Sequence, residues 1–157
     1  MSVAAPPTVC VDFDGTICRY AFPDCGEPRP EVIEVLRALR AEGWRIVIHS
    51  ARVNSEWSEP VRTEKCEAMI VYLVAHDVPF DEVWGLAFER TSADEGTQGY
   101  HWCFEPRHTG KPVAHVYLDD RAVAAAPGIR PPALLALCRE VAERANAEYG
   151  GELACPR

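Results

Sequence analysis

Lysine is scarce in this chain of 157 residues: 14 of its 16 basic residues are arginines, and Lys65 and Lys111 are the only lysines. The net charge is -8, and no cluster of basic residues forms a tail or a stripe. Such a cluster is the usual mark of proteins that bind nucleic acid or membrane surfaces through charge alone. The composition therefore argues against that kind of binding, although it leaves room for a local basic pocket.

Long hydrophobic runs are also missing. No window approaches the roughly 18 apolar residues of a membrane-spanning helix, and residues 1–8 lack the charged leader and apolar stretch of a signal peptide. We therefore expect a cytoplasmic protein that makes no contact with a membrane.

A Cys-x-x-Cys pair is absent, and the seven cysteines form an odd set. Since Cys10 and Cys66 fall on expected core faces, we interpret most of the cysteines as reduced, small hydrophobic residues rather than as a disulfide framework. A zinc site is an alternative for His101, Cys103 and His108, which lack a regular ligand spacing and a fourth ligand.

Strands and helices are expected to alternate along one domain that spans residues 1–157. Short runs rich in Val and Ile predict buried strands, and apolar residues at 3.6-residue spacing predict helices. The expected strands are the apolar run before Asp12 and residues 44–49, 82–88 and 113–118. The expected helices are residues 30–42, 61–76 and 133–149, and residues 89–112 are expected to be irregular. This order predicts a three-layer α/β/α, Rossmann-like domain with a parallel sheet, whose core lies in residues 8–125 and whose C-terminal helix lies in residues 131–150.

Polar residues are placed at the ends of the expected strands. Because the carboxyl ends of parallel strands meet at one edge of a sheet, these side chains should converge on one site. Two carboxylates one residue apart, Asp12 and Asp14, suggest a divalent cation between them, with Mg²⁺ favoured. Carboxylates together with a hydroxyl, a lysine and an arginine suit phosphoryl transfer, which needs a metal and an anion in one place. The converging residues are Asp12, Asp14, Ser50, Arg52, Lys111, Asp119 and Asp120.

These residues resemble the four motifs of the haloacid dehalogenase (HAD) superfamily of phosphatases. The segment Asp12-Phe-Asp14-Gly15-Thr16 is similar to the first motif, Ser50 to the second, Lys111 in Gly-Lys-Pro to the third and Asp119-Asp120 to the fourth. The match covers about residues 8–125, with the motifs in the expected order.

The resemblance implies a Mg²⁺-dependent phosphomonoester hydrolase. Asp12 would attack phosphorus and become an aspartyl phosphate, and Asp14 would protonate the leaving oxygen and then deprotonate the hydrolytic water. The metal ligands would be Asp12, the backbone carbonyl of Asp14, Asp119 and, directly or through water, Asp120.

The remaining motif residues would contact the substrate or shape the site. Ser50 would hydrogen-bond a phosphoryl oxygen, and Lys111 would neutralise charge on the phosphoryl group and on Asp12. Gly15 would let the chain turn sharply past the site, and Thr16 would fix that turn. His49 is interpreted as a strand residue near the site without a catalytic role.

Members of the superfamily often carry a cap domain, but residues 17–29 and 89–110 are too short for one. We therefore expect a capless protein, whose open site fits a large substrate or a small one enclosed by a second copy in a homo-oligomer. Residues 46–52, 72–81 and 118–121 are similar to the phosphatase half of phage-type polynucleotide kinase/3′-phosphatases. In that family an arginine at the place of Arg52 binds the phosphate. A polynucleotide 3′-phosphatase, acting on a nucleic-acid 3′ end, is therefore an alternative to a small-molecule phosphatase.

Two non-enzymatic alternatives stay open. A signalling receiver module combines similar residues but needs its phosphorylated Asp after the third strand, where this chain has Phe88-Glu89-Arg90. A phosphate-binding protein of the same fold would be expected to have lost Asp14 or Lys111, and both are present.

Overall fold

A four-stranded parallel sheet forms the centre of the molecule in the computed structural model, which describes residues 5–90, 100–105, 110–120 and 130–149. Its strands are β1 (Thr8–Val11), β2 (Arg45–Ile48), β3 (Glu82–Val83) and β6 (Val116–Leu118), in the order β3-β2-β1-β6. The predicted α/β class with a parallel sheet is confirmed, and the arrangement is consistent with a Rossmann-like fold.

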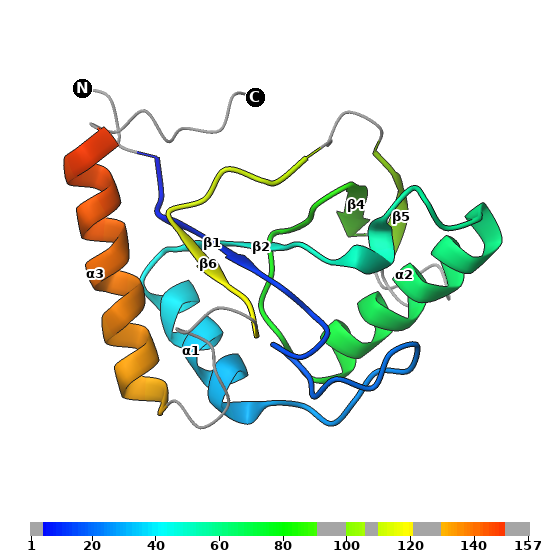
Figure 1. Cartoon of the computed structure of the whole chain (residues 1–157), viewed down its shortest axis with the longest axis horizontal. Helices are drawn as coiled ribbons and strands as arrows, with labels where there is room; N and C mark the ends of the chain where they lie inside the picture. Colours follow the sequence, from blue (N-terminus) through cyan, green and yellow to red (C-terminus); the bar gives the residue numbers. More distant parts are fainter. Residues whose placement is uncertain (1–4, 91–99, 106–109, 121–129, 150–157) are drawn as a thin grey trace.

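Three helices flank the sheet. Helices α1 (Pro30–Ala41) and α3 (Pro131–Tyr149) lie together on one side, and α2 (Glu59–Ala75) lies on the other (Figure 1). Each helix begins and ends within about two residues of its predicted bounds. In α1 this agreement has a local cause, because Pro30 suits the first turn and Gly43 adopts a φ of +84° after the last one.

Burial of the sheet on both faces explains why the strands are continuous apolar runs in the sequence. All four residues of β1 are buried, because helices cover both faces of the sheet and leave neither side to solvent. Helix α1 contributes one apolar stripe to this core, formed by Val32, Ile33, Val35, Leu36 and Leu39.

The predicted strand over residues 82–88 is divided in the structure. Gly85, with a φ of +91°, separates β3 from β4 (Leu86–Arg90). Strand β4 leaves the main sheet and pairs antiparallel with β5 (Tyr100–Phe104). The prediction that residues 89–112 are irregular is therefore wrong for the residues of this hairpin.

Long-range contacts account for the hairpin. Phe88 is paired with Trp102, whose Nε1 donates a hydrogen bond of 3.0 Å to Glu67 of α2. The guanidinium of Arg62, also on α2, lies 3.7 Å from the centroid of the Phe104 ring. The hairpin is thus held against α2 by residues that are far from it in sequence.

The fourth main-sheet strand is shorter than predicted. Residues 113–115 do not belong to β6, and the Ala114 N–H donates to the Tyr117 hydroxyl instead of to a neighbouring strand. The hydroxyl of Tyr117 in turn donates to the carbonyl of Pro112. These contacts fold the segment after Lys111 back on β6.

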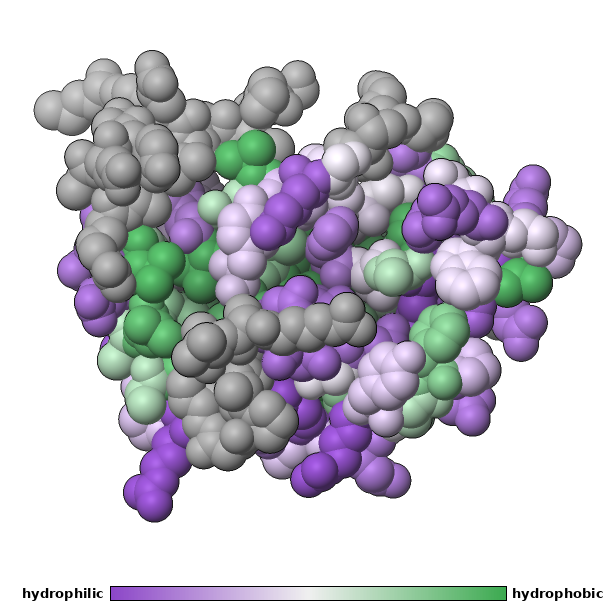
Figure 2. All heavy atoms as spheres, in the orientation of Figure 1, coloured by the Kyte–Doolittle hydropathy of each residue, from purple (hydrophilic) through white to green (hydrophobic). Residues whose placement is uncertain are grey.

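No large hydrophobic patch is visible among the described residues on the face shown in Figure 2. Hydrophilic side chains dominate the middle of this face, and hydrophobic side chains lie in small separate patches. None of the helices in the described part of the chain has the length and apolar character needed to cross a membrane.

The six cysteines within the described residues are free, and Cys155 lies outside them.

Candidate active site

Three neighbouring strands deliver their following residues to one edge of the sheet. Val11 at the end of β1 is paired with Ile48 of β2 and Leu118 of β6. The next residues, Asp12, His49 and Asp119, therefore leave the sheet side by side. Backbone hydrogen bonds of 2.9 Å extend this register, from Asp12 N–H to the Leu118 carbonyl and from His49 N–H to the Val11 carbonyl.

Three carboxylates meet at this edge. Asp12, Asp119 and Asp120 each offer an oxygen, and these oxygens lie within 4.8 Å of one another. Burial, and then the negative charge of Asp119, raise the pKa of Asp12 from its ordinary 3.8 to about 7. A cation between the carboxylates would remove this repulsion. The all-oxygen donor set fits a hard divalent cation and does not by itself distinguish Mg²⁺ from other such ions.

Gly15 makes room for one of these carboxylates. Its φ is +90°, and a Cβ added to it would lie 2.5 Å from Oδ2 of Asp120. A side chain at this position would therefore strain the backbone and displace Asp120. The predicted sharp turn at Gly15 is present, and the close approach of Asp120 is a second reason for the glycine.

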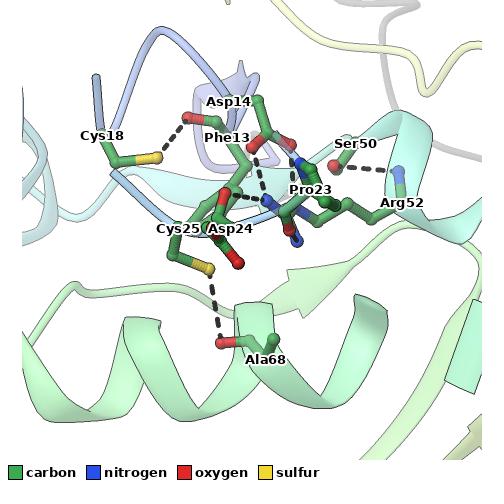
Figure 3. A network of polar contacts seen from close by, with 9 residues as sticks. All are labelled: Phe13, Asp14, Cys18, Pro23, Asp24, Cys25, Ser50, Arg52 and Ala68. Carbon is green, nitrogen blue, oxygen red and sulfur yellow. Dashed lines mark hydrogen bonds and ion pairs between the residues drawn. The ribbon is translucent and has the colours of Figure 1, made fainter. Parts of the chain in front are cut away.

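Asp14 does not belong to this cluster, and its carboxylate points toward the guanidinium of Arg52 (Figure 3). The Nη2 and Nε atoms of Arg52 donate to the two carboxylate oxygens of Asp14 at 2.7 and 2.8 Å. Such a bidentate pair fixes the orientation of the carboxylate. The carboxylate of Asp14 is accordingly not one of the three that could share a metal.

Arg52 is enclosed by protein. Its side chain is 0% exposed, and its guanidinium also donates to the carbonyls of Pro23 and Asp24. The rings of Phe13 and Phe22 lie 5.2 and 5.3 Å from its guanidinium carbon. Arg52 was predicted to bind phosphate, but in this structure it faces Asp14 and the 23–24 segment instead of an open cavity.

The two predicted hydroxyls also make contacts within the protein. The Oγ of Ser50 accepts a hydrogen bond of 3.2 Å from the backbone N–H of Arg52, which caps the short 3₁₀ helix η1 (Ala51–Val53). Thr16 is buried, and its Oγ1 donates to Oδ2 of Asp12 at 3.5 Å. Thr16 thus connects the turn to Asp12, and Ser50 fixes the start of the segment that carries Arg52.

Lys111 and Asp12 line the same cavity, of about 290 Å³. We call it the lysine cavity; its other lining residues include Cys10, His49, Tyr117 and Asp119. The Nζ of Lys111 lies 3.8 Å from the centroid of the Tyr117 ring, which supports the ammonium group. Burial and the charge of Lys111 lower the pKa of His49, and burial raises the pKa of the Cys10 thiol to about 12. The thiol therefore stays protonated, and Lys111 supplies the positive charge of this cavity.

A second cavity, of about 320 Å³, is lined by carboxylates of the same edge. We call it the aromatic cavity, because Tyr20, Phe22 and Trp57 line it. Asp12 and Asp119 line both cavities, and Asp14 and Asp120 line this one only. The carboxylates at this edge of the sheet thus border one cavity that contains a cation and another that contains aromatic rings.

These aromatic residues were not predicted from the sequence as site residues, and neither were Cys10 and Tyr117. The available signal was the position of aromatic residues shortly after predicted motifs: Tyr20 and Phe22 follow the first motif, and Trp57 follows Ser50 and Arg52. Of the suggested zinc ligands, His101 and Cys103 are in β5, and His108 lies outside the described residues. Within the described residues, the Asp12 cluster is the only group of three or more His, Cys, Asp or Glu residues close enough to share a metal.

Comparisons with known proteins leave the family open. No family model and no curated protein matches the chain. The chain is similar to the structure of a conserved protein from Bacteroides thetaiotaomicron, with 23% identity over 87% of this chain and 92% of the other and a TM-score of 0.54. A target protein from Vibrio cholerae has 25% identity over 88% of this chain and 98% of the other, with a TM-score of 0.43. The first similarity shows a shared fold.

Proposed function

We propose that this chain is a Mg²⁺-dependent phosphomonoester hydrolase that works through an aspartyl phosphate, as a capless member of the HAD superfamily. The observation that carries the proposal is the position of Asp12. Its carboxylate shares one cavity with Lys111 and belongs to the cluster with Asp119 and Asp120. A nucleophile, a cation for the phosphoryl oxygens and ligands for a metal are thus within one small site.

The reaction has two halves. In the first, an oxygen of Asp12 attacks phosphorus, the bond between phosphorus and the ester oxygen breaks, and Asp14 gives a proton to that oxygen. In the second, water attacks the phosphorus of the aspartyl phosphate and passes a proton to Asp14. The bond to Asp12 then breaks, so that inorganic phosphate leaves and the carboxylate is restored.

Charge stabilisation is divided among the surrounding residues. Lys111 neutralises negative charge on the phosphoryl oxygens and on Asp12 as the new bond forms. Asp12, Asp119 and Asp120, with the backbone carbonyl of Asp14, would hold Mg²⁺. The bound ion would supply further positive charge at the phosphoryl group. Ser50 is next to this edge of the sheet and is assigned to a phosphoryl oxygen.

Arg52 acts through Asp14 in this scheme. Its bidentate contact orients the Asp14 carboxylate, which lines the aromatic cavity beside Asp12. We therefore assign Arg52 as a positioning residue and no longer as a phosphate ligand. Phosphate binding by Arg52 was part of the resemblance to polynucleotide 3′-phosphatases. Because Arg52 is buried, this part of the resemblance does not support the polynucleotide 3′-phosphatase alternative.

Phosphate release from 4-nitrophenyl phosphate tests the proposal. Wild-type protein should release phosphate with Mg²⁺ and not with a chelator, Asp12→Asn should abolish release, and Asp14→Asn should strongly reduce it. A 3′-phosphorylated oligonucleotide, assayed beside a panel of sugar and nucleotide monophosphates, separates the two kinds of substrate. Full activity of Asp12→Asn with metal present would refute the assignment of the nucleophile, and a receiver or binding module would release no phosphate.

A further inference from the structure

The two cavities could receive the two parts of a phosphomonoester, which are the phosphoryl group and the leaving group. Of these two cavities, Lys111 lines the lysine cavity alone and Asp14 lines the aromatic cavity alone. If Asp14 protonates the ester oxygen, the leaving group must lie beside Asp14, which lines the aromatic cavity and not the lysine cavity. The walls of the aromatic cavity are therefore the surface that a leaving group would meet.

This wall exposes large rings to solvent. Tyr20 is 67% exposed and Trp57 is 38% exposed. Exposed rings that line a cavity together are a common feature of ligand sites, in which a few polar groups fix the orientation of an apolar ligand. Here the polar groups are the carboxylates of the proposed reaction centre.

The rings of Phe22 and Trp57 are held in position by the protein. The Nε1 of Trp57 donates a hydrogen bond of 3.0 Å to the Ala51 carbonyl, and its ring centroid lies 6.0 Å from that of Phe22. The Nζ of Lys65 is 4.1 Å from the Phe22 centroid and 4.9 Å from the Trp57 centroid. The guanidinium of Arg52 also lies near the Phe22 ring. Two cations and a hydrogen bond therefore fix this pair of rings.

We propose that the aromatic cavity binds the leaving group of the substrate and that this group is planar and aromatic. This inference rests on the proposed phosphatase function and narrows its substrate class to small phosphomonoesters with an aromatic ring. Stacking on a protein ring suits a flat π-system, and the cavity of about 320 Å³ has the size of a small-molecule site. A net charge of -8 disfavours a leaving group that is itself a polyanion.

Steady-state kinetics with three substrates test this inference. Phenyl phosphate has its ring on the ester oxygen, a nucleoside monophosphate has its ring beyond a sugar, and glycerol phosphate has no ring. In the Tyr20→Leu/Trp57→Leu double variant, the KM for the aromatic substrates should rise about tenfold, the scale of one lost stacking contact. The KM for glycerol phosphate should stay unchanged. The aromatic substrate with the larger rise identifies which ring position the cavity accepts.

Two further variants separate stacking from a structural role. Tyr20→Phe keeps the ring and should keep the wild-type KM for the aromatic substrates. Tyr20→Ala removes a mostly exposed side chain, and it should raise that KM even if the double variant is poorly folded. An equal loss of activity on all three substrates, or wild-type KM values that do not depend on the ring, would overturn the aromatic subsite while leaving the phosphatase in place.

Calorimetric binding keeps the two proposals apart. If wild-type protein hydrolyses none of the three substrates with Mg²⁺, the phosphatase is refuted, and the binding of the same compounds then decides the subsite. Tighter binding of the aromatic compounds than of glycerol phosphate, lost in the double variant, supports the aromatic cavity as a binding site. Equal binding of all three, or no binding, overturns it.

Discussion

Arg52 donates to both carboxylate oxygens of Asp14, at 2.7 and 2.8 Å, from a side chain that is 0% exposed (Figure 3). The same guanidinium donates to the carbonyls of Pro23 and Asp24. The buried guanidinium of Arg52 therefore links three parts of the chain, which are the segment after β2, Asp14 of the first motif and residues 23–24. The orientation of the proposed proton carrier depends on this cation.

Replacement of Arg52 should destabilise the fold strongly. Arg52→Gln leaves the carboxylate of Asp14 without its partner and two carbonyls without their donor, and breaking a buried pair from one side costs about 3–5 kcal/mol. Denaturant-induced unfolding measures this loss. Arg139→Gln, which breaks an ion pair with Glu42 at the surface, is the control and should change stability little. Equal stability of wild type and Arg52→Gln would show that the pair does not support the fold.

Gly15 and Gly43 offer a matched pair of substitutions. Both have a positive φ, so alanine should cost roughly 1–2 kcal/mol of stability at either position. Only at Gly15 would the new Cβ collide with Asp120, at 2.5 Å, since nothing lies within 4 Å at Gly43. Gly15→Ala should therefore weaken Mg²⁺ binding, measured by calorimetry, and Gly43→Ala should not.

The comparison between the two glycine variants isolates the effect of displacing the Asp120 carboxylate. Without metal both proteins should unfold at lowered temperatures, Gly15→Ala at the lower one because of its collision with Asp120, and only Gly43→Ala should gain the wild-type increase when Mg²⁺ is added. Unchanged Mg²⁺ affinity in Gly15→Ala would mean that Asp120 is not part of the metal site.

Metal-free protein should lose stability as the pH rises through the window set by Asp12. Its pKa is raised from 3.8 in the unfolded chain to about 7 in the folded state, mainly by burial. Between these values the folded protein holds a proton that the unfolded chain has lost, so the free energy of unfolding falls with rising pH. Unfolding in the presence of a chelator, at several pH values, measures the slope.

Asp12→Asn is the control for this pH dependence, because the amide does not titrate. The difference in stability between wild type and Asp12→Asn should grow in favour of the variant as the pH rises from about 4 to about 7. Parallel pH profiles for the two proteins would contradict the shifted pKa of Asp12.

The sequence was sufficient to predict the features that depend on short segments. The apolar run before Asp12 and the polar residues after β2 and β6 are local patterns. Parallel pairing then brings their ends together, as the contacts of Asp12 with its neighbours show. The same locality explains why the bounds of α1 were predictable from Pro30 and Gly43.

Features that depend on distant contacts were not predictable in this way. The burial of Arg52 follows from Asp14, Pro23 and Asp24, which lie 28–38 positions away in sequence. The aromatic cavity likewise combines Tyr20 and Phe22 with Trp57, from separate segments of the chain. Periodicity and motif spacing carry no information on such encounters, because they are decided by how the segments pack.

The location of the phosphoryl group during turnover is the most direct test of the proposed mechanism. Asp14→Asn protein is mixed with 4-nitrophenyl phosphate and Mg²⁺ and quenched in acid, and its peptides are analysed by mass spectrometry. Because 4-nitrophenolate leaves without a proton from Asp14, the first half of the reaction should proceed while the second is slow. The mechanism predicts a phosphoryl group on Asp12. A phosphoryl group on another residue, or turnover by the wild type with no phosphorylated Asp12 in either protein, would contradict it.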